Sequence, residues 1–181
     1  GPQAPLCSKA EDTTGLVMHV SSFSKCLAPG YRVGWVAAGR YASRIQRQKL
    51  SLSLATTIPV QIALADYLKQ GGFENHLRHL RHTLASQEAE LIQAVEHHFP
   101  PGTKLARPQG GYFLWLELPS QVDTLLLHQQ ALERGISIAP GPIFSAKREF
   151  SHHVRLNFGH PDSERLEAAM ATLGELINQQ L

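Results

Sequence analysis

One segment in the first quarter of the chain combines an amine with several groups that bind anions. Lys25 lies in the run Ser22-Phe23-Ser24-Lys25, and Pro29-Gly30, Arg32 and Gly34 follow it closely. Hydroxyl groups, the backbone N–H groups of a glycine turn and a guanidinium are the groups with which proteins bind phosphate. The segment therefore indicates an anion site that contains an amine.

The amine of Lys25 indicates the class of ligand. A lysine that forms a Schiff base must first lose its proton, and an amine that is shielded from water beside a second cation becomes a nucleophile toward carbonyls. Apolar Leu27 and Ala28 and cationic Arg32 are placed to have this effect. The carbonyl compound that best fits a phosphate-binding loop is pyridoxal 5′-phosphate (PLP), which binds through a lysine Schiff base. We therefore predict PLP as the cofactor.

The same residues resemble the signature of a known family. Ser22-Phe23-Ser24-Lys25 with Pro29-Gly30, Arg32 and Gly34 is similar to the PLP-lysine signature of fold-type I aminotransferases of class I/II. It most resembles 2-aminoadipate-type aminotransferases and the aminotransferase-like domain of MocR-type regulators in the GntR superfamily. The resemblance implies that Lys25 is the catalytic Schiff-base lysine and that Ser22, Ser24 and Arg32 bind the cofactor's phosphate. The alternative is a solvated lysine in a Ser/Gly/Pro loop before a buried strand.

Short strands and helices must hold this loop in place. We expect strands at residues 17–20 and 33–38, the first of them apolar throughout, as a strand buried between helices is. Apolar spacing predicts helices over residues 40–54 and about 59–70. Thr57 is expected to cap the second helix, with Pro59 in its first turn.

The second half of the chain begins with a long predicted helix, residues 73–98, and then alternates strands and helices. The predicted strands are residues 104–107, 112–118, 136–139 and 154–158, and the predicted helices are residues 122–134 and 164–178, the last capped by Asp162 or Ser163. The segments 108–115, with the pattern Pro-x-Gly-Gly-Tyr-Phe-x-Trp, and 133–141 resemble the small domain of the same aminotransferases. The alternative for the first segment is a plain β-hairpin with a glycine turn.

Arg155 is the second candidate site residue. It lies between apolar neighbours in an alternating strand, where an arginine is costly unless it meets an anion. Its planar fork suits bidentate recognition of a carboxylate. The family resemblance implies that Arg155 binds the substrate's α-carboxylate. The alternative is an arginine whose head reaches solvent or a nearby glutamate.

Composition excludes several classes of function. The chain is 43% hydrophobic and 18% charged with a formal net charge of +2, which is typical of a folded domain without a basic footprint for DNA. Its two cysteines make no disulfide framework and no apolar run is long enough for a bilayer, so we expect a cytoplasmic protein without membrane contact. His76, His79 and His82 recur at every third position, but no carboxylate or cysteine completes a metal site, and none is predicted.

The predicted fold is α/β, the PLP-dependent transferase (aminotransferase) fold. Residues 1–72 are expected to be the end of an incomplete PLP-binding large domain, and residues 73–181 the small C-terminal α+β domain. In the family, the groups that hold the pyridine nitrogen and stack on the cofactor precede the lysine by more residues than are present here, and Asp12 is not assigned to them. We expect the C-terminal portion of a larger PLP protein that by itself transaminates weakly or not at all.

Three functions fit this sequence. The favoured one is the aminotransferase-like domain of a MocR-type transcriptional regulator, in which a separate N-terminal module binds DNA and this chain does not. The alternative is a stand-alone class I/II aminotransferase that transfers an amino group between an amino acid and a 2-oxo acid, and the third is a non-catalytic scaffold. The resemblance implies a homodimer with an amino acid or 2-oxo acid as ligand, and side-chain specificity is not predicted.

Overall fold

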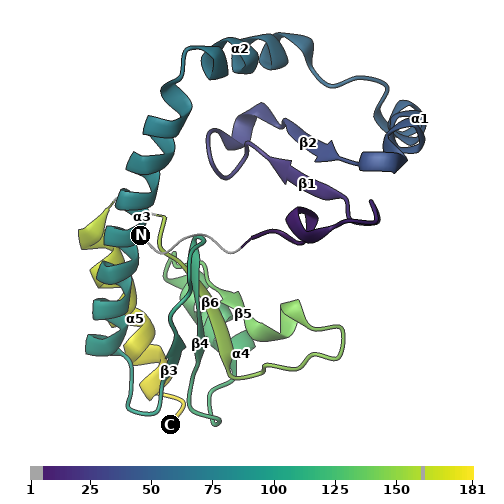
Figure 1. Cartoon of the computed structure of the whole chain (residues 1–181). Helices are drawn as coiled ribbons and strands as arrows, with labels where there is room; N and C mark the ends of the chain where they lie inside the picture. The colour runs from purple at the N-terminus through teal and green to yellow at the C-terminus, as the bar shows by residue number, and fades with distance from the viewer. Residues whose placement is uncertain (1–5, 160–161) are drawn as a thin grey trace. The chain divides into compact units, whose positions relative to one another are not determined.

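A computed structural model describes residues 6–159 and 162–181 of the chain, which divides into two units, Gly1–Leu80 and Arg81–Leu181 (Figure 1). The division falls within the long helix α3 (Gly72–His98), and the boundary predicted after residue 72 coincides with the beginning of this helix. Residues 1–5, at which the predicted first domain begins, lie outside the described residues. Each unit has its own sheet.

The sheet of the first unit is a single antiparallel pair. β1 (His19–Ser22) pairs with β2 (Gly34–Ala37), which places Ser22 opposite Gly34. The strand expected at residues 17–20 begins later than predicted, and the prediction that it is buried is wrong, because Val20 is 74% exposed. An isolated pair of strands covers neither of its own faces, so an apolar strand gains little burial from its partner alone.

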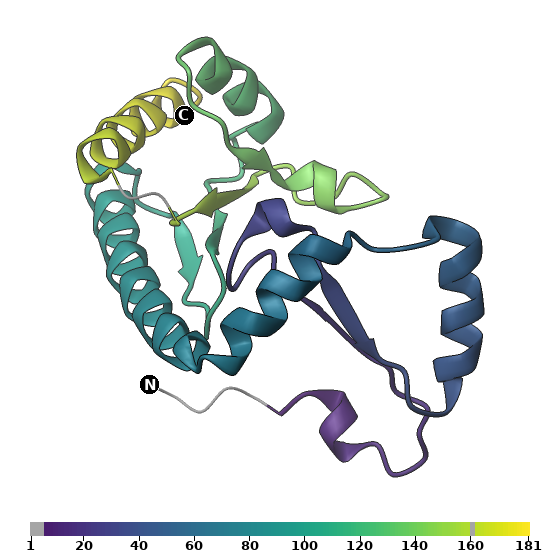
Figure 2. The same ribbon diagram turned by 90° about the horizontal axis from the view of Figure 1, so that it is seen from above.

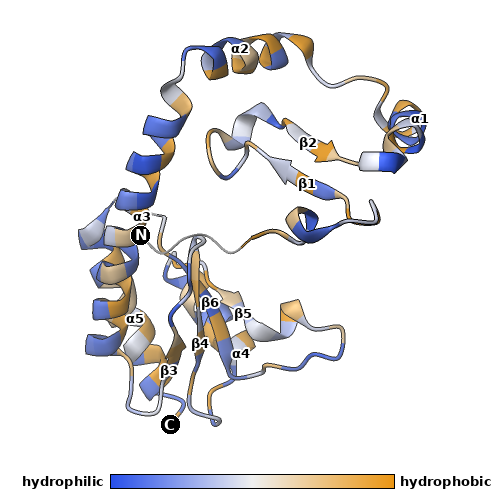
Figure 3. Cartoon of the chain, in the orientation of Figure 1, coloured by the Kyte–Doolittle hydropathy of each residue, from blue (hydrophilic) through white to orange (hydrophobic). Residues whose placement is uncertain are grey.

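Two helices follow β2. After the short 3-10 segments η2 (Pro29–Tyr31) and η3 (Gly39–Tyr41), α1 (Ala42–Ser53) and α2 (Ile58–Lys69) form close to the predicted bounds. Pro59 lies in the first turn of α2 as predicted, but the Thr57 side chain makes no capping bond. An N-cap hydroxyl bonds the second or third N–H of a helix, and Pro59 removes one of these two donors. Apolar residues remain on the surface of β2 and α2 (Figure 3), with Ile62 65% exposed.

A carboxylate organises the segment before β1. Asp12 accepts hydrogen bonds from Nζ of Lys9 at 2.9 Å and from the backbone N–H groups of Leu16 at 3.1 Å and Val17 at 3.0 Å. The lysine donor, together with these backbone donors, holds the pKa of Asp12 well below its usual range. Both of its oxygens are therefore occupied by the local fold, which explains Asp12 without any role at a cofactor.

The second unit contains a four-stranded antiparallel sheet in the order β3-β4-β6-β5. The strands are β3 (Lys104–Ala106), β4 (Phe113–Glu117), β6 (His153–Asn157) and the two-residue β5 (Ala139–Pro140), which leads into η4 (Gly141–Phe144). The prediction of a strand at residues 136–139 is therefore mostly wrong, because only Ala139 of these residues belongs to β5. The Ile136 N–H bonds the Ala131 carbonyl at 2.9 Å and Gly135 has a φ of 75°, so these residues end the preceding helix in a Schellman motif.

Helices cover one face of this sheet. The second half of α3, α4 (Thr124–Glu133) and α5 (Ser163–Asn178) share one core with Leu114 and Leu116 of β4 and their cross-strand partners on β6. In both views of the ribbon α5 lies beside α3 (Figures 1 and 2), and a Cβ at Gly174 would collide with the His98 carbonyl of α3. Asp162 caps α5 as predicted, accepting the Arg165 N–H at 3.0 Å.

The alternation of β4 and β6 gives the sheet a second face, opposite the helix-covered core. Phe113, Trp115 and Arg155 point away from the buried Leu114 and Leu156 because successive side chains of a strand point to opposite faces. This second face carries the arginine that the sequence singles out. Among the described residues, no helix is both long and apolar enough to cross a bilayer.

The Asp12 contacts predict a local effect of its removal. Asp12→Asn should speed hydrogen exchange of the Leu16 and Val17 amides at pH 7 by roughly tenfold, because a neutral amide is a weaker acceptor than a carboxylate. Glu11→Gln, which neutralises the adjacent exposed acid, is the control and should leave both amides unchanged.

The depressed pKa of Asp12 also determines how its contribution to the stability of the fold changes with pH. A carboxyl group with a depressed folded-state pKa contributes stability in full above its ordinary value of 3.8 and loses that contribution as pH falls toward the folded-state pKa. An NMR titration of the Asp12 carboxylate with a midpoint at or above 3.8 would contradict this assignment.

Candidate functional site

β1 leads directly into a single helical turn that carries Lys25. The Phe23 N–H bonds the Val33 carbonyl at 3.0 Å, and the Phe23 carbonyl accepts the Leu27 N–H at 2.9 Å and the Ala28 N–H at 3.1 Å. Lys25 lies at the exposed surface of this turn. We expected Leu27 and Ala28 to shield this amine from water. Both belong to the same short turn as Lys25, and the described residues of the first unit leave Lys25 exposed.

The side chain of Arg32, at the other end of the loop, contacts the same turn. Its Nη1 donates to Oγ of Ser24 at 3.2 Å and to the Pro29 carbonyl at 3.4 Å. The backbone of Arg32 is left-handed, with φ 51° and ψ 35°, which costs about 1–2 kcal/mol for a residue with a Cβ. Such strained positions cluster at functional sites. Two of the three predicted phosphate ligands, Ser24 and Arg32, thus lie together.

Ser22 lies at the end of β1, where Gly34 allows the two strands to approach closely. A Cβ on Gly34 would lie only 2.8 Å from the Ser21 carbonyl oxygen and 3.2 Å from Cβ of Ser22. The Ser22 carbonyl accepts the Cys26 thiol at 3.6 Å, while its hydroxyl makes no bond to Ser24 or Arg32 in the described part of the chain. The third predicted phosphate ligand is therefore near the loop but not joined to the other two.

The groups of this loop fit the phosphate of PLP. A guanidinium has five N–H donors, and the contacts of Arg32 with Ser24 and Pro29 use only Nη1. The remaining donors, with the hydroxyls of Ser22 and Ser24, can bind a dianionic phosphate by charge-assisted hydrogen bonds. Lys25 belongs to the same turn and supplies an amine next to them.

In the second unit, β6 places Arg155 opposite Trp115 of β4 and Ala139 of β5. The guanidinium carbon of Arg155 lies 4.7 Å from the ring centroid of Phe113 and 4.7 Å from that of Phe144. No carboxylate among the described residues forms an ion pair with Arg155. The guanidinium therefore packs on aromatic rings. Of the two alternative partners left open by the sequence, solvent and a glutamate, the glutamate is not found among the described residues.

The aromatic residues around Arg155 were missed by the sequence prediction. Trp115 packs edge-to-face on Phe144 at 5.5 Å between centroids and stacks on His153 at 5.5 Å. Burial, reinforced by the neighbouring His152, lowers the pKa of His153, so this ring is neutral at pH 7. A prediction that pairs β4 with β6 in the correct register would have placed Trp115 beside Arg155. No pattern in the local sequence predicts that Phe144 packs there.

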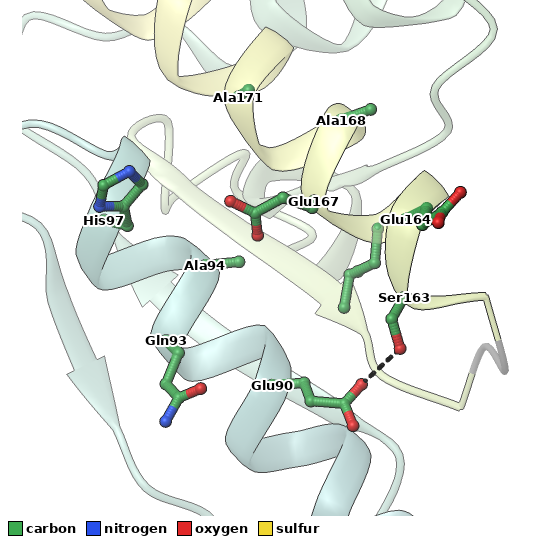
Figure 4. Close-up of a pocket in the computed structure, with 10 residues that line it drawn as sticks. Glu90, Gln93, Ala94, His97, Ser163, Glu164, Glu167, Ala168 and Ala171 are labelled. Carbon is green, nitrogen blue, oxygen red and sulfur yellow. Dashed lines mark hydrogen bonds between the residues drawn. The ribbon is translucent and has the colours of Figure 1, made fainter.

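A separate cavity of about 910 Å³ lies between α3 and α5 of the second unit (Figure 4). Ala94 and Ala168 are among its apolar lining residues, and the carboxylates of Glu90 and Glu167 lie between the two helices, the first of them accepting the Ser163 hydroxyl at 2.9 Å. Carboxylates repel a phosphate or an amino acid's carboxylate. The cavity contains none of the predicted site residues, so we do not assign the ligand site to it.

The repeated histidines of α3 are not part of a cluster of metal-ligating side chains in the part of the chain that the structure describes. Within residues 6–159 and 162–181 no group of three or more His, Cys, Asp or Glu side chains is arranged to hold a metal ion.

The sequence matches the family described as aminotransferase class I and II over residues 2–173. Over all 181 residues it is 45% identical to YdcR, an uncharacterized HTH-type transcriptional regulator of Escherichia coli, and covers 39% of that protein. A crystal structure of kynurenine aminotransferase from Pyrococcus horikoshii in complex with PMP resembles the chain with a TM-score of 0.88 and 32% identity, covering 96% of this chain and 43% of that one.

A second solved structure carries a phosphopyridoxyl group. LysN, the α-aminoadipate aminotransferase of Thermus thermophilus, complexed with N-(5′-phosphopyridoxyl)-L-leucine, has a TM-score of 0.83 at 28% identity, covering 90% of this chain and 42% of its own. The chain thus spans about two fifths of the length of each of these proteins.

The geometry of the loop predicts the effect of changing its guanidinium. In the full-length natural protein, Arg32→Lys should weaken PLP binding by roughly ten- to a hundredfold, because hydrogen bonds to charged groups contribute about 1.5–3 kcal/mol and a lysine keeps the charge but loses the fork. An absorbance titration with PLP measures the affinity. Arg47→Lys, on the exposed surface of α1, is the matched control. Equal affinity of the Arg32→Lys and unchanged proteins would contradict the phosphate assignment.

Proposed function

We propose that this chain, which belongs to the aminotransferase class I and II family, is the PLP-binding and amino-acid-recognising part of a MocR-type transcriptional regulator of the GntR superfamily. The observation that carries this proposal is the 45% identity to an HTH-type regulator over the entire chain, against 32% to the kynurenine aminotransferase. In this proposal residues 1–72 are the end of the PLP-binding large domain and residues 73–181 are the small domain.

The proposed chemistry uses the loop of the first unit. PLP, the cofactor, supplies an electron sink for negative charge at the α carbon of an amino acid. Lys25 would hold the cofactor through its Nζ, and the same amine, when free of the cofactor, could take and return the α proton of the amino acid as a general base and acid. Arg32 and Ser24, which already contact each other at 3.2 Å, bind the phosphate together with Ser22.

Arg155 provides the proposed recognition of the amino acid. The N–H donors of a guanidinium point outward in the plane of the group, so the rings of Phe113 and Phe144 beside its central carbon leave donors for a carboxylate. Aromatic rings also exclude water from the guanidinium and thereby strengthen its attraction for an anion. Arg155 therefore suits the α-carboxylate that amino acids and 2-oxo acids share.

The proposed partners follow from the proposal that the protein is a transcriptional regulator. DNA is bound by another part of the regulator, since a formal net charge of +2 gives this chain no basic footprint. The ligand of the full-length protein is an amino acid or a 2-oxo acid. The assembly is a homodimer, and the protein acts in the cytoplasm, where DNA and amino acids are both present.

A stand-alone aminotransferase is the second candidate function. It is supported by the TM-score of 0.88 to the kynurenine aminotransferase at 32% identity. On either reading, the 181-residue chain by itself is expected to transaminate weakly or not at all.

One experiment separates these candidates. The full-length protein, loaded with PLP, is given a panel of amino acids while 2-oxo acid formation and affinity for DNA from upstream of its own gene are measured. The regulator predicts DNA binding that changes with one amino acid or a few, and little turnover. Many turnovers per protein without DNA binding would establish the enzyme, and PLP binding with neither property would favour a scaffold.

The recognition role of Arg155 predicts a ligand-dependent defect. Arg155→Leu should raise the amino acid concentration that half-saturates the change in cofactor absorbance by roughly ten- to a hundredfold, because a charge-assisted bond of about 1.5–3 kcal/mol is lost. The corresponding primary amine, which has no carboxylate, should bind equally to both proteins. Arg107→Leu, an exposed site after β3, is the control variant. An equal loss for amino acid and amine would contradict carboxylate recognition.

A further inference from the structure

The first turn of α3 contacts the turn that carries Lys25. Nε2 of His76 lies 2.9 Å from the carbonyl oxygen of Cys26. The rings of Phe73 and Phe23 meet edge-to-face with their centroids 6.0 Å apart. Residues three apart lie on one side of a helix, so Phe73 and His76 face the loop together. All four residues belong to the first unit.

These contacts hold the residues on either side of Ser24-Lys25. Phe23 is also fixed through its backbone, which bonds Val33 on one side and Leu27 on the other. A single helical turn leaves its last carbonyl groups without partners inside the turn. His76 provides such a partner for the Cys26 carbonyl. The ring of Phe23 before the lysine and the carbonyl of Cys26 after it therefore both contact the same face of α3.

The chemistry of the contact between His76 and the Cys26 carbonyl determines which ring nitrogen of His76 carries the proton. A backbone carbonyl can only accept, so Nε2 of the half-buried His76 must donate. His79, the next member of the repeat, is exposed. The three-residue repeat of histidines thus has one member that reaches the lysine turn.

We propose that His76 and Phe73 are positioning residues for Lys25, which order its turn so that the amine is presented beside Ser24 and Arg32. The inference rests on the proposed function, since it concerns the binding of PLP by this lysine. A turn that is ordered in advance removes part of the conformational cost from the binding step. Loss of the His76 bond therefore weakens formation of the Schiff base without removing any group that touches the cofactor.

Two variants of similar size isolate the donated bond. In the full-length protein, His76→Met should raise the dissociation constant for PLP by roughly tenfold, since one part-buried hydrogen bond is lost. His76→Gln has a similar length and can still donate from its amide, so it should stay within about threefold of the unchanged protein. His79→Met makes the same substitution at an exposed position and should change nothing.

Three measurements distinguish positioning from general stability. The dissociation constant is read from Schiff-base absorbance without turnover, thermal unfolding reports whether each variant folds, and the ¹⁵N spectrum of the His76 ring reports whether Nε2 carries the proton. We expect a protonated Nε2 and a defect in His76→Met that His76→Gln rescues. Equal PLP affinity in folded His76→Met and unchanged protein would overturn the positioning role alone. Absence of any lysine adduct in the unchanged protein would overturn the proposed function and this role with it.

Discussion

The contact between the Arg32 guanidinium and the Ser24 hydroxyl closes the loop on which the site depends. It joins the first residues after β1 to the last residues before β2. The backbone bond between Phe23 and Val33, the next pair of residues outward along the chain, closes the same loop. Gly34 is required just beyond, because any side chain there would meet the Ser21 carbonyl. Lys25 lies within this closed loop, so its position is fixed by groups that also suit a phosphate. The bond from the Arg32 guanidinium to the Ser24 hydroxyl has an uncharged acceptor. An anion adds Coulombic attraction that a hydroxyl lacks, so an anionic ligand can compete for the guanidinium.

In the second unit, strand alternation separates the core from the proposed recognition residue, Arg155. Leu114 and Leu156 face the helices and belong to the core, while Trp115 and Arg155, one position away on the same strands, face outward. Because successive side chains alternate, a change at Arg155 leaves the core contacts in place. Phe113, beside the guanidinium, belongs to one segment that resembles the family's small domain, and Ala139, the cross-strand partner of Arg155, belongs to the other. The two segments therefore meet at this arginine.

The sequence predicted those features that depend on neighbouring residues. The loop around Lys25, the long helix α3, the Asp162 cap and the outward position of Arg155 all follow from local spacing, and the structure contains them. β5 is shorter than predicted because Ile136 still takes part in the end of α4, a competition between two local patterns that spacing alone does not decide. The exposure of β1, the packing of Phe144 on Arg155 and the bond from His76 to Cys26 depend on which distant segments meet, and no local period records that.

The measurement that tests the central claim most directly is chemical trapping of the cofactor on the full-length protein. PLP is added, the adduct is reduced with borohydride, and the labelled peptide is identified by mass spectrometry in the unchanged protein and in Lys25→Ala. The account predicts one label, on Lys25, that disappears in the variant. A label on another lysine, or equal labelling of both proteins, would contradict it.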